Sequence, residues 1–307
     1  MNLKSLDYLN LSEIDYHFLK NLKSLEYLNL SWNKIKSLEY FDFPYDNRLR
    51  QLNLENNLIE KIDQNFINGN KIEILNRLEF PEENFLRQLN LENNLIEKID
   101  QKFLMNLKSL DYLNLSGNKI KSLYGLESPE ENLLRQLNLE NNLIEKIDQN
   151  LIKCLEYLNL SGNKIESLKD FSFPEGNVLR QLNIENNLIE EIDYHFLKNL
   201  KSLEYLNLSG NKIEIVNRLE FPEENLLKDL NLENNLIEKI DRKFLINLKS
   251  LEYLNLSGNK IESLDDLSFP DENLLRKLNL ENNLIERIEF YFLNKLKSLE
   301  YLNLSES

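Results

Sequence analysis

Residue types that mark several common functional classes are scarce in this chain. Its one cysteine, Cys154, leaves no internal disulfide to form and favours a reducing compartment over a secreted one. The two histidines, His17 and His195, are too far from each other and from that cysteine to give a zinc-ligand spacing. The seven glycines contain no phosphate-binding loop. We therefore expect neither a cofactor nor a metal.

Long apolar runs and an excess of positive charge are also missing. The N-terminal residues MNLKSLDYLN lack the apolar core of a signal peptide, and no run approaches membrane-spanning length. Lys and Arg number 37 against 52 Asp and Glu, a net charge of −15. That balance opposes binding to nucleic-acid phosphates. The sequence thus predicts an intracellular protein, in the cytoplasm or, if the source is a parasite or a virus, in the host cytoplasm. Its partner is expected to be neither a nucleic acid nor a membrane.

What the chain does contain is one motif repeated along its length. The stretch LRQLNLENNLIEKID occupies residues 49–63 and recurs unchanged at 86–100 and 134–148. The pattern Leu-x-x-Leu-x-Leu-x-x-Asn-x-Ile recurs mostly every 24 residues. Its units start at Leu6, Leu25, Leu49, Leu86, Leu110, Leu134, Leu155, Leu179, Leu203, Leu227, Leu251, Leu275 and Leu299.

This pattern resembles the leucine-rich-repeat family over essentially the whole chain. The resemblance implies an α/β-type solenoid, a horseshoe with a concave parallel β-sheet and a convex side of loops and short 3₁₀ or helical turns. The alternation in x-Leu-x-Leu-x agrees, because it has the period of a half-buried strand. One such strand cannot bury its apolar face alone, whereas stacked coils can. We expect a single domain, residues 1–307, of about thirteen coils.

Two kinds of coil alternate. A tyrosine coil reads like Leu203-Glu-Tyr-Leu-Asn-Leu-Ser-Gly-Asn211, and a glutamine coil like Leu134-Arg-Gln-Leu-Asn-Leu-Glu-Asn-Asn142. Glutamine coils return through a segment whose phenylalanine is expected to fill the convex side, and tyrosine coils return through a proline segment. The asparagine that ends each motif is expected to form a buried structural ladder. Its members are Asn33, Asn57, Asn94, Asn118, Asn142, Asn163, Asn187, Asn211, Asn235, Asn259 and Asn283.

The repeat is irregular at two places, residues 11–14 and 63–85. In the first, five residues are deleted between Leu11 and Ile14; in the second, the strand of a tyrosine coil is missing before Pro81. Neither end has a recognisable cap, although solenoids usually need one. These features leave open a fragment of a longer array, association through bare ends, or a partial gene product without a selected partner.

The strand positions between the leucines should project from the concave face, the usual binding surface of such solenoids. One column alternates acidic with basic residues, the next Tyr with Gln, the third is Asn, expected to face solvent as at Asn183, and the fourth alternates Ser with Glu. The predicted partner-binding residues are Trp32, Tyr112, Tyr157, Tyr205, Tyr253, Arg135, Arg180, Glu204 and Glu185. The alternatives are sheet stability for the charged column, since alternation removes like-charge repulsion, and local packing for Trp32.

Catalysis is not expected from this sequence. The two histidines occupy copies of one segment, Asp-Tyr-His-Phe-Leu-Lys-Asn-Leu, and the acidic residues recur in every coil, whereas an active site is a unique constellation. The sequence favours a non-enzymatic module that binds a protein partner on its concave face. The alternative is a structural element that associates end to end through uncapped coils. Asn-Leu-Ser, an N-glycosylation acceptor sequence, occurs seven times and also favours an intracellular protein.

Overall fold

The strands of the fold lie at the leucine motifs, and each motif occupies one coil. The computed structural model describes residues 5–6, 19, 21–38, 43, 47–62, 85–99, 103–105, 107–124, 133–147, 152–169, 171–192, 195–216, 219–241, 244–288 and 290–306. These fall into two compact units, Met1–Cys154 and Leu155–Ser307. That all 307 residues form one domain stays a prediction.

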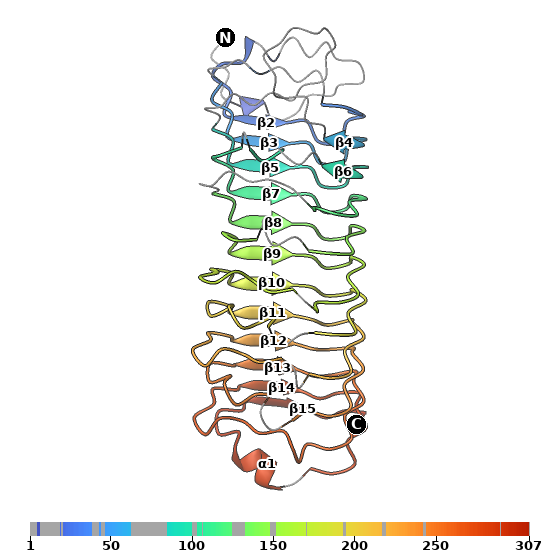
Figure 1. The fold of residues 1–307 in the computed structure, drawn as a ribbon, viewed down its shortest axis with the longest axis vertical. Helices are drawn as coiled ribbons and strands as arrows, with labels where there is room; N and C mark the ends of the chain where they lie inside the picture. Colours follow the sequence, from blue (N-terminus) through green and yellow to red (C-terminus); the bar gives the residue numbers. More distant parts are fainter. Residues whose placement is uncertain are drawn as a thin grey trace. The chain divides into compact units, whose positions relative to one another are not determined.

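In the first unit, a parallel sheet has the strand order β1-β2-β3-β5-β7-β8 (Figure 1). A pair of two-residue strands, β4 and β6, forms a second parallel ladder. The bounds are β1 Ser5–Leu6, β2 Tyr27–Asn29, β3 Gln51–Asn53, β4 Lys61–Ile62, β5 Gln88–Asn90, β6 Lys98–Ile99, β7 Tyr112–Asn114 and β8 Gln136–Asn138.

In the second unit, each strand pairs in parallel with the next one along the chain, from β9 to β15. The bounds are β9 Tyr157–Asn159, β10 Gln181–Asn183, β11 Tyr205–Asn207, β12 Asp229–Asn231, β13 Tyr253–Asn255, β14 Lys277–Asn279 and β15 Tyr301–Asn303. One short helix, α1, spans Phe290–Asn294. The predicted parallel-sheet solenoid is thus confirmed, and the described parts of the return segments are mostly irregular chain with short turns.

The register places identical positions of successive coils opposite one another. Leu182 of β10 pairs with Leu206 of β11, and both side chains are fully buried. The apolar residues that flank β10 and the isoleucine beyond its ladder asparagine are buried in the same way: Leu179, Ile184 and Ile189 are each 0% exposed. Stacking therefore gives each coil the apolar contact that it cannot make alone.

The ladder asparagines satisfy the backbone where the chain turns after each strand. Asn187 is 4% exposed, and its Nδ2 donates to the carbonyl oxygens of Leu160, Ile184 and Glu185 at 3.0, 3.1 and 3.2 Å. Its Oδ1 accepts from the backbone N–H of Ile165, 22 residues earlier in the chain, at 3.1 Å. Because one amide joins two coils, the predicted structural ladder is confirmed.

The residue before the ladder asparagine has left-handed backbone geometry in both coil types. It is asparagine in glutamine coils, as at Asn186 (φ 52°), and glycine in tyrosine coils, as at Gly210 (φ 64°). A Cβ added at Gly210 would lie 2.2 Å from Oδ1 of Asn186 in the preceding coil. The Asn186 side chain therefore occupies the space that glycine leaves in the next coil.

This contact predicts that Gly210→Ala lowers the free energy of unfolding by about 2 kcal/mol, the sum of left-handed strain and a clash. Urea denaturation followed by circular dichroism measures the change. Gly176→Ala is the matched control, because Gly176 has φ 74° but no heavy atom within 4 Å of an added Cβ. Equal losses for the two variants would contradict the steric role of Asn186.

The return segments bury phenylalanines from both coil types. The expected Phe103, Phe196, Phe244 and Phe292 are 7%, 0%, 3% and 6% exposed, so this prediction is confirmed. The proline segments add rings that the sequence analysis did not single out. The centroids of Phe173 and Phe196 are 5.6 Å apart, those of Phe221 and Phe244 5.9 Å, and those of Phe269 and Phe292 6.0 Å.

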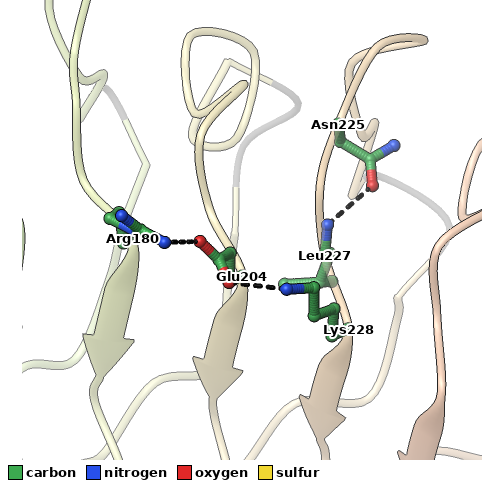
Figure 2. Close-up of polar contacts among 5 residues, drawn as sticks. All are labelled: Arg180, Glu204, Asn225, Leu227 and Lys228. Carbon is green, nitrogen blue, oxygen red and sulfur yellow. Dashed lines mark hydrogen bonds and ion pairs between the residues drawn. The ribbon is translucent and has the colours of Figure 1, made fainter.

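A second set of buried asparagines lies three residues after the prolines, at Asn47, Asn177, Asn225 and Asn273. Oδ1 of Asn225 accepts from the N–H of Leu227 at 3.2 Å (Figure 2). Its Nδ2 donates to the carbonyl oxygens of Pro222 and Asn247, the latter 22 residues away, at 2.7 and 2.8 Å. Asn225 therefore fastens its proline turn to its own strand and to the next coil, and Nδ2 of Asn273 makes the equivalent bonds to Pro270 and to Lys295 of the next coil. The fixed Pro-x-x-Asn spacing was the signal in the sequence.

The two predicted irregularities lie mostly outside the described residues: none of 11–14 is described, and of 63–85 only Phe85 is. On either side of the second one, β3 and β5 are direct neighbours in the sheet, with Gln51 opposite Gln88. Two glutamine coils therefore adjoin each other at this point of the first unit, and the alternation of coil types is interrupted.

Candidate partner-binding face

The sheet has one face that the leucines do not use. In β9–β14 the middle residue is a buried leucine, while the first residue and the residue before the strand point away from the core. We call these outward positions of β9–β15 the strand face. The structure brings Tyr157, Arg180, Glu204, Tyr205 and Tyr253 together on it, while Trp32, Tyr112 and Arg135 lie in the first unit.

Tyrosines and polar residues alternate along the strand face. Tyr205 lies between Gln181 and Asp229, and Tyr253 lies between Asp229 and Lys277. Both tyrosines are half-buried, and burial raises the pKa of each phenol above 10.0. Nearby carboxylates, Glu185 for Tyr205 and Glu233 for Tyr253, raise these pKa values further. The phenols therefore stay protonated as donors at neutral pH.

The charged column forms ion pairs across neighbouring strands (Figure 2). The Glu204 carboxylate lies between two basic side chains: Oε1 accepts from the Arg180 guanidinium, and Oε2 lies 2.8 Å from Nζ of Lys228. The Glu204 side chain is 23% exposed, whereas Arg180 and Lys228 are 59% and 50% exposed. This geometry favours the sheet-stability interpretation for Arg180 and Glu204.

The ion pairs predict a pH-dependent contribution to stability. The hydrogen bond from Lys228, and then that from Arg180, lower the pKa of Glu204 from its ordinary 4.5. A carboxyl whose pKa falls on folding stabilises the protein above its unfolded pKa, and this stabilisation is lost as the pH falls through the folded pKa. We expect Glu204→Gln to lower the free energy of unfolding at pH 7 by less than about 1 kcal/mol, because partly exposed pairs are screened.

Urea denaturation at pH 7 and again well below pH 4.5 measures this effect, which should vanish at the lower pH. Glu166→Gln is the control, because Glu166 is exposed and has no ion pair within the described ranges. A loss at Glu204 that is the same at both pH values would show that the variant disturbs packing rather than an ion pair.

The asparagine column, the third of the four, is more buried than the sequence predicted. Asn183 is half-buried, but in the tyrosine coils of the second unit the equivalent Asn159, Asn207 and Asn255 are only 4–5% exposed, so solvent exposure was the wrong prediction for them. Oδ1 of Asn207 accepts from N and Oγ of Ser209 at 3.0 and 2.7 Å. Its Nδ2 donates to Glu185 of the preceding coil at 3.1 Å. The amide nitrogen to which a glycan would be attached is thus buried and bonded in the folded protein.

This network also changes the interpretation of Glu185. Its second carboxylate oxygen accepts from Nδ2 of Asn186 at 3.2 Å, so both oxygens have partners within the protein. Glu233 and Glu281 make the same contact to the asparagine of the following coil, at 3.0 and 2.9 Å. Glu185 is therefore held in place by amides, and it remains available only at the edge of the strand face.

Trp32 has the most unusual environment of the predicted residues. It is 71% exposed and has φ 60°, at the position that glycine occupies in the regular tyrosine coils. Its backbone N–H donates to the carbonyl oxygen of Glu55 in the next coil at 3.0 Å. A β-branched or aromatic residue at positive φ is strained, and with most of its ring in solvent Trp32 does not serve as packing filler. Arg135 is exposed beside β8.

The strand face is hollowed at its C-terminal end. A depression of about 750 Å³ crosses β12–β15 and contains residues that the sequence analysis placed in columns but did not single out. Its lining residues are Asp229, Glu252, Tyr253, Arg276, Lys277, Asn279, Glu300 and Tyr301. Asp229 and Lys277 stand where the earlier glutamine coils have Gln, and this departure from the repeat was the signal available in the sequence.

Two further observations concern other classes of site. In the described ranges, no cluster of three or more His, Cys, Asp or Glu is arranged to hold a metal ion. His195 is exposed on a return segment, and His17 lies outside the described residues. Within the part of the chain that the structure covers, every helix falls short of the length and apolarity needed to cross a membrane.

Solved structures show where else this fold occurs. An internalin (InlF) of Listeria monocytogenes is 23% identical with a TM-score of 0.61, over 99% of this chain and 88% of that one. A chain of the LRIM1/APL1C complex is 20% identical with a TM-score of 0.73, over 97% of this chain but 51% of its own. A chain of an octameric complex of latrophilin 3, Unc5D and FLRT2 is 20% identical with a TM-score of 0.60, over 100% and 89%.

Family models also match the sequence, although no curated protein does. A model described as leucine rich repeat matches residues 85–144, 153–213 and 225–285. A second, described as BspA type leucine rich repeat region, matches residues 1–84. The first model alone covers more than half of the 307 residues, so the chain belongs to the leucine-rich repeat family.

Proposed function

We propose that this chain is a non-enzymatic module that binds a protein partner on the strand face. The observation that carries the proposal is the row of tyrosines at Tyr157, Tyr205, Tyr253 and Tyr301, in register on alternate strands of one sheet. Tyrosine offers a broad, rigid contact area and a hydrogen-bonding tip, and it is enriched at the centres of protein interfaces.

The comparisons support a binding role without assigning a partner. Leucine-rich repeats are generally non-enzymatic interaction modules, and two of the structural neighbours come from complexes of several proteins. Because those chains are about 20% identical to this one, they support the fold and the class of function only.

The ion pairs define which residues should carry the affinity. Arg180 and Glu204 already neutralise each other across β10 and β11, so a partner would have to break that pair to use either charge. A tyrosine, in contrast, can offer its ring to a partner without the breaking of an ion pair. We therefore propose the tyrosines as anchors and the charged column as a source of orientation and association rate.

Alanine substitution at the strand face tests the proposal. The wild-type protein is used to capture a partner from its native source, and affinities are then measured with the purified partner. Tyr157→Ala, Tyr205→Ala, Tyr253→Ala and, separately, Trp32→Ala should weaken binding by about 1 kcal/mol or more at true anchors. Melting temperatures should change little, because each ring is at least partly in solvent.

Substitutions on the return segments are the control. Lys169→Ala and Glu175→Ala change exposed residues away from the strand face and should leave affinity unchanged. If these variants abolish binding while the tyrosine variants bind normally, the partner uses the other side of the molecule and the assignment is wrong.

A second candidate function, self-association, is favoured by the outermost described strand. Leu299, Leu302 and Leu304 around β15 are partly exposed, whereas the equivalent Leu251, Leu254 and Leu256 are 0–2% exposed. Apolar, unpaired strand edges promote association. Sedimentation equilibrium should show mass rising with concentration, and a monomer at all concentrations would remove this candidate.

An intracellular location is part of the proposal. The buried, hydrogen-bonded amides of the Asn-Leu-Ser sequences support it, because they serve the fold rather than glycan attachment. Immunofluorescence in the native cells tests it, and detection on the cell surface or in the medium would contradict it.

A further inference from the structure

The hollow across β12–β15 gives the proposed binding face a defined chemistry, and the inference below depends on that proposed function. In the other glutamine coils the first strand residue is Gln51, Gln88, Gln136 or Gln181. In the last two it is Asp229 and Lys277, and both line the hollow on either side of Tyr253. A near-identical array therefore departs from its repeat at the place where its face is hollowed.

Negative charge in the hollow exceeds positive charge. Three carboxylates, Asp229, Glu252 and Glu300, line it against two cations, Arg276 and Lys277. Nε of Arg276 lies 4.0 Å from Oε2 of Glu252, a longer contact than the 2.8 Å between Lys228 and Glu204, and the Glu252 side chain is 45% exposed against 23% for Glu204. Glu252 is therefore more open to an outside cation than Glu204 is. The chain as a whole carries −15, so its long-range field also attracts cations.

The carboxylate of Asp229 is not fully compensated. Burial, and then the neighbouring Glu252, raise the pKa of Asp229 above its ordinary 3.8, and Lys277 offsets only part of this. Tyr253 shows the same negative potential, because Glu233 and Asp229 add to the burial that raises its pKa. A cation from outside would lower the energy of the Asp229 carboxylate.

Besides carboxylates, the hollow offers aromatic rings on which a cationic side chain can stack. Tyr253 and Tyr301 both line the hollow, separated by the strand that carries Lys277, and Tyr301 is 51% exposed. A guanidinium can stack on a tyrosine ring while its N–H groups donate to carboxylates. The hollow thus combines an aromatic surface with acceptors of matching charge.

We propose that this hollow receives a basic side chain, preferably arginine, of the partner protein, with Asp229 and Glu252 as the acceptors and Tyr253 as the stacking surface. Lys277 then limits the affinity, because it places a positive charge beside the incoming one. The partner segment that docks here is basic.

Capped synthetic peptides test this proposal even before a partner protein has been isolated. The probes are a dodecapeptide that alternates Arg with Ser and its counterpart that alternates Glu with Ser, titrated against the full chain at low ionic strength by isothermal calorimetry. The Arg peptide should bind and the Glu peptide should not. Asp229→Gln and Glu252→Gln should each weaken the Arg peptide about threefold to tenfold, whereas Lys277→Gln should strengthen it by a similar factor.

Two of these variants restore the glutamine of the repeat and are therefore expected to fold, which circular dichroism checks. Glu262→Gln makes the same change of charge as Glu252→Gln on an exposed return segment and should leave the affinity unchanged. Preference for the Glu peptide, equal effects of Glu252→Gln and Glu262→Gln, or absence of Arg-peptide binding would each overturn the proposal.

The captured partner separates this proposal from the proposed function. If Tyr157→Ala and Tyr205→Ala weaken the partner while Asp229→Gln and Lys277→Gln leave its affinity unchanged, the strand face binds but the hollow is not its cationic subsite. If neither pair of variants changes the affinity, both proposals fail.

Discussion

Phe196→Ala is expected to lower the free energy of unfolding by about 3–5 kcal/mol, the usual loss when a fully buried aromatic ring leaves a cavity. Phe196 is 0% exposed, and its ring centroid is 5.6 Å from that of Phe173 and 6.2 Å from that of Phe171. The cavity should persist, because these rings come from two coils that the sheet and the ladder hold in register. Urea denaturation followed by circular dichroism measures the loss.

Ile246→Ala is the control for this substitution. Ile246 is also an apolar residue of a return segment, but it is 54% exposed, so its truncation should change stability by no more than about 0.5 kcal/mol. Phe196→Leu, which keeps most of the volume, should fall between the two. A loss at Phe196 no larger than that at Ile246 would contradict a packed return side.

Asn187→Leu is expected to have the second largest effect, a loss of about 3 kcal/mol. The substitution keeps the approximate size of the side chain but removes four hydrogen bonds at once, three donated by Nδ2 and one accepted by Oδ1. Unpaired buried polar groups each cost about 1–3 kcal/mol, and part of that total is recovered where water or a shifted backbone reaches them. Hydrogen exchange should rise first at Ile165, whose amide loses its acceptor.

Substitutions at two other positions of the same coil are the controls for the loss of stability at Asn187. Gln181 is exposed on the strand face, so Gln181→Leu should change stability by less than about 0.5 kcal/mol. Asn183 is half-buried and accepts from the N–H of Glu185 at 3.1 Å, so Asn183→Leu should give an intermediate loss. Losses of the same size at Gln181 and Asn187 would mean that the inner and outer sides of the strand are reversed.

The sequence could specify the coil because the coil is a local property. Alternation of apolar and polar residues indicates a strand, and recurrence every 24 residues indicates that the unit must bury its apolar face on its own neighbours. From this alone follow the buried positions of Leu182 and Leu206, the structural role of Asn187, and the burial of Phe196. Because the motif is copied many times, few other folds would bury the apolar face of every copy.

Only part of the candidate site could be predicted from the sequence. The columns of the strand face follow from the strand period, so Tyr205 and Tyr253 were placed correctly. Arg180 and Glu204 were offered as contacts for a partner, with sheet stability as the alternative, and they bond to each other across two strands. Whether a charge is free or paired depends on side chains 24 residues away, and the pattern within one coil does not contain that information.

What the sequence by itself determined is therefore the unit: its strand, its inner leucines, its ladder asparagine and its class of fold. What only the tertiary structure decided is each contact between coils. Nδ2 of Asn207 is bonded by Glu185 of the preceding coil, and Oδ1 of Asn186 occupies the space beside Gly210. The hollow beside Tyr253 arises in the same way, from side chains of four separate strands. Local periodicity fixes which way a side chain points, but burial, pairing and cavities are set by the neighbours that stacking brings to it.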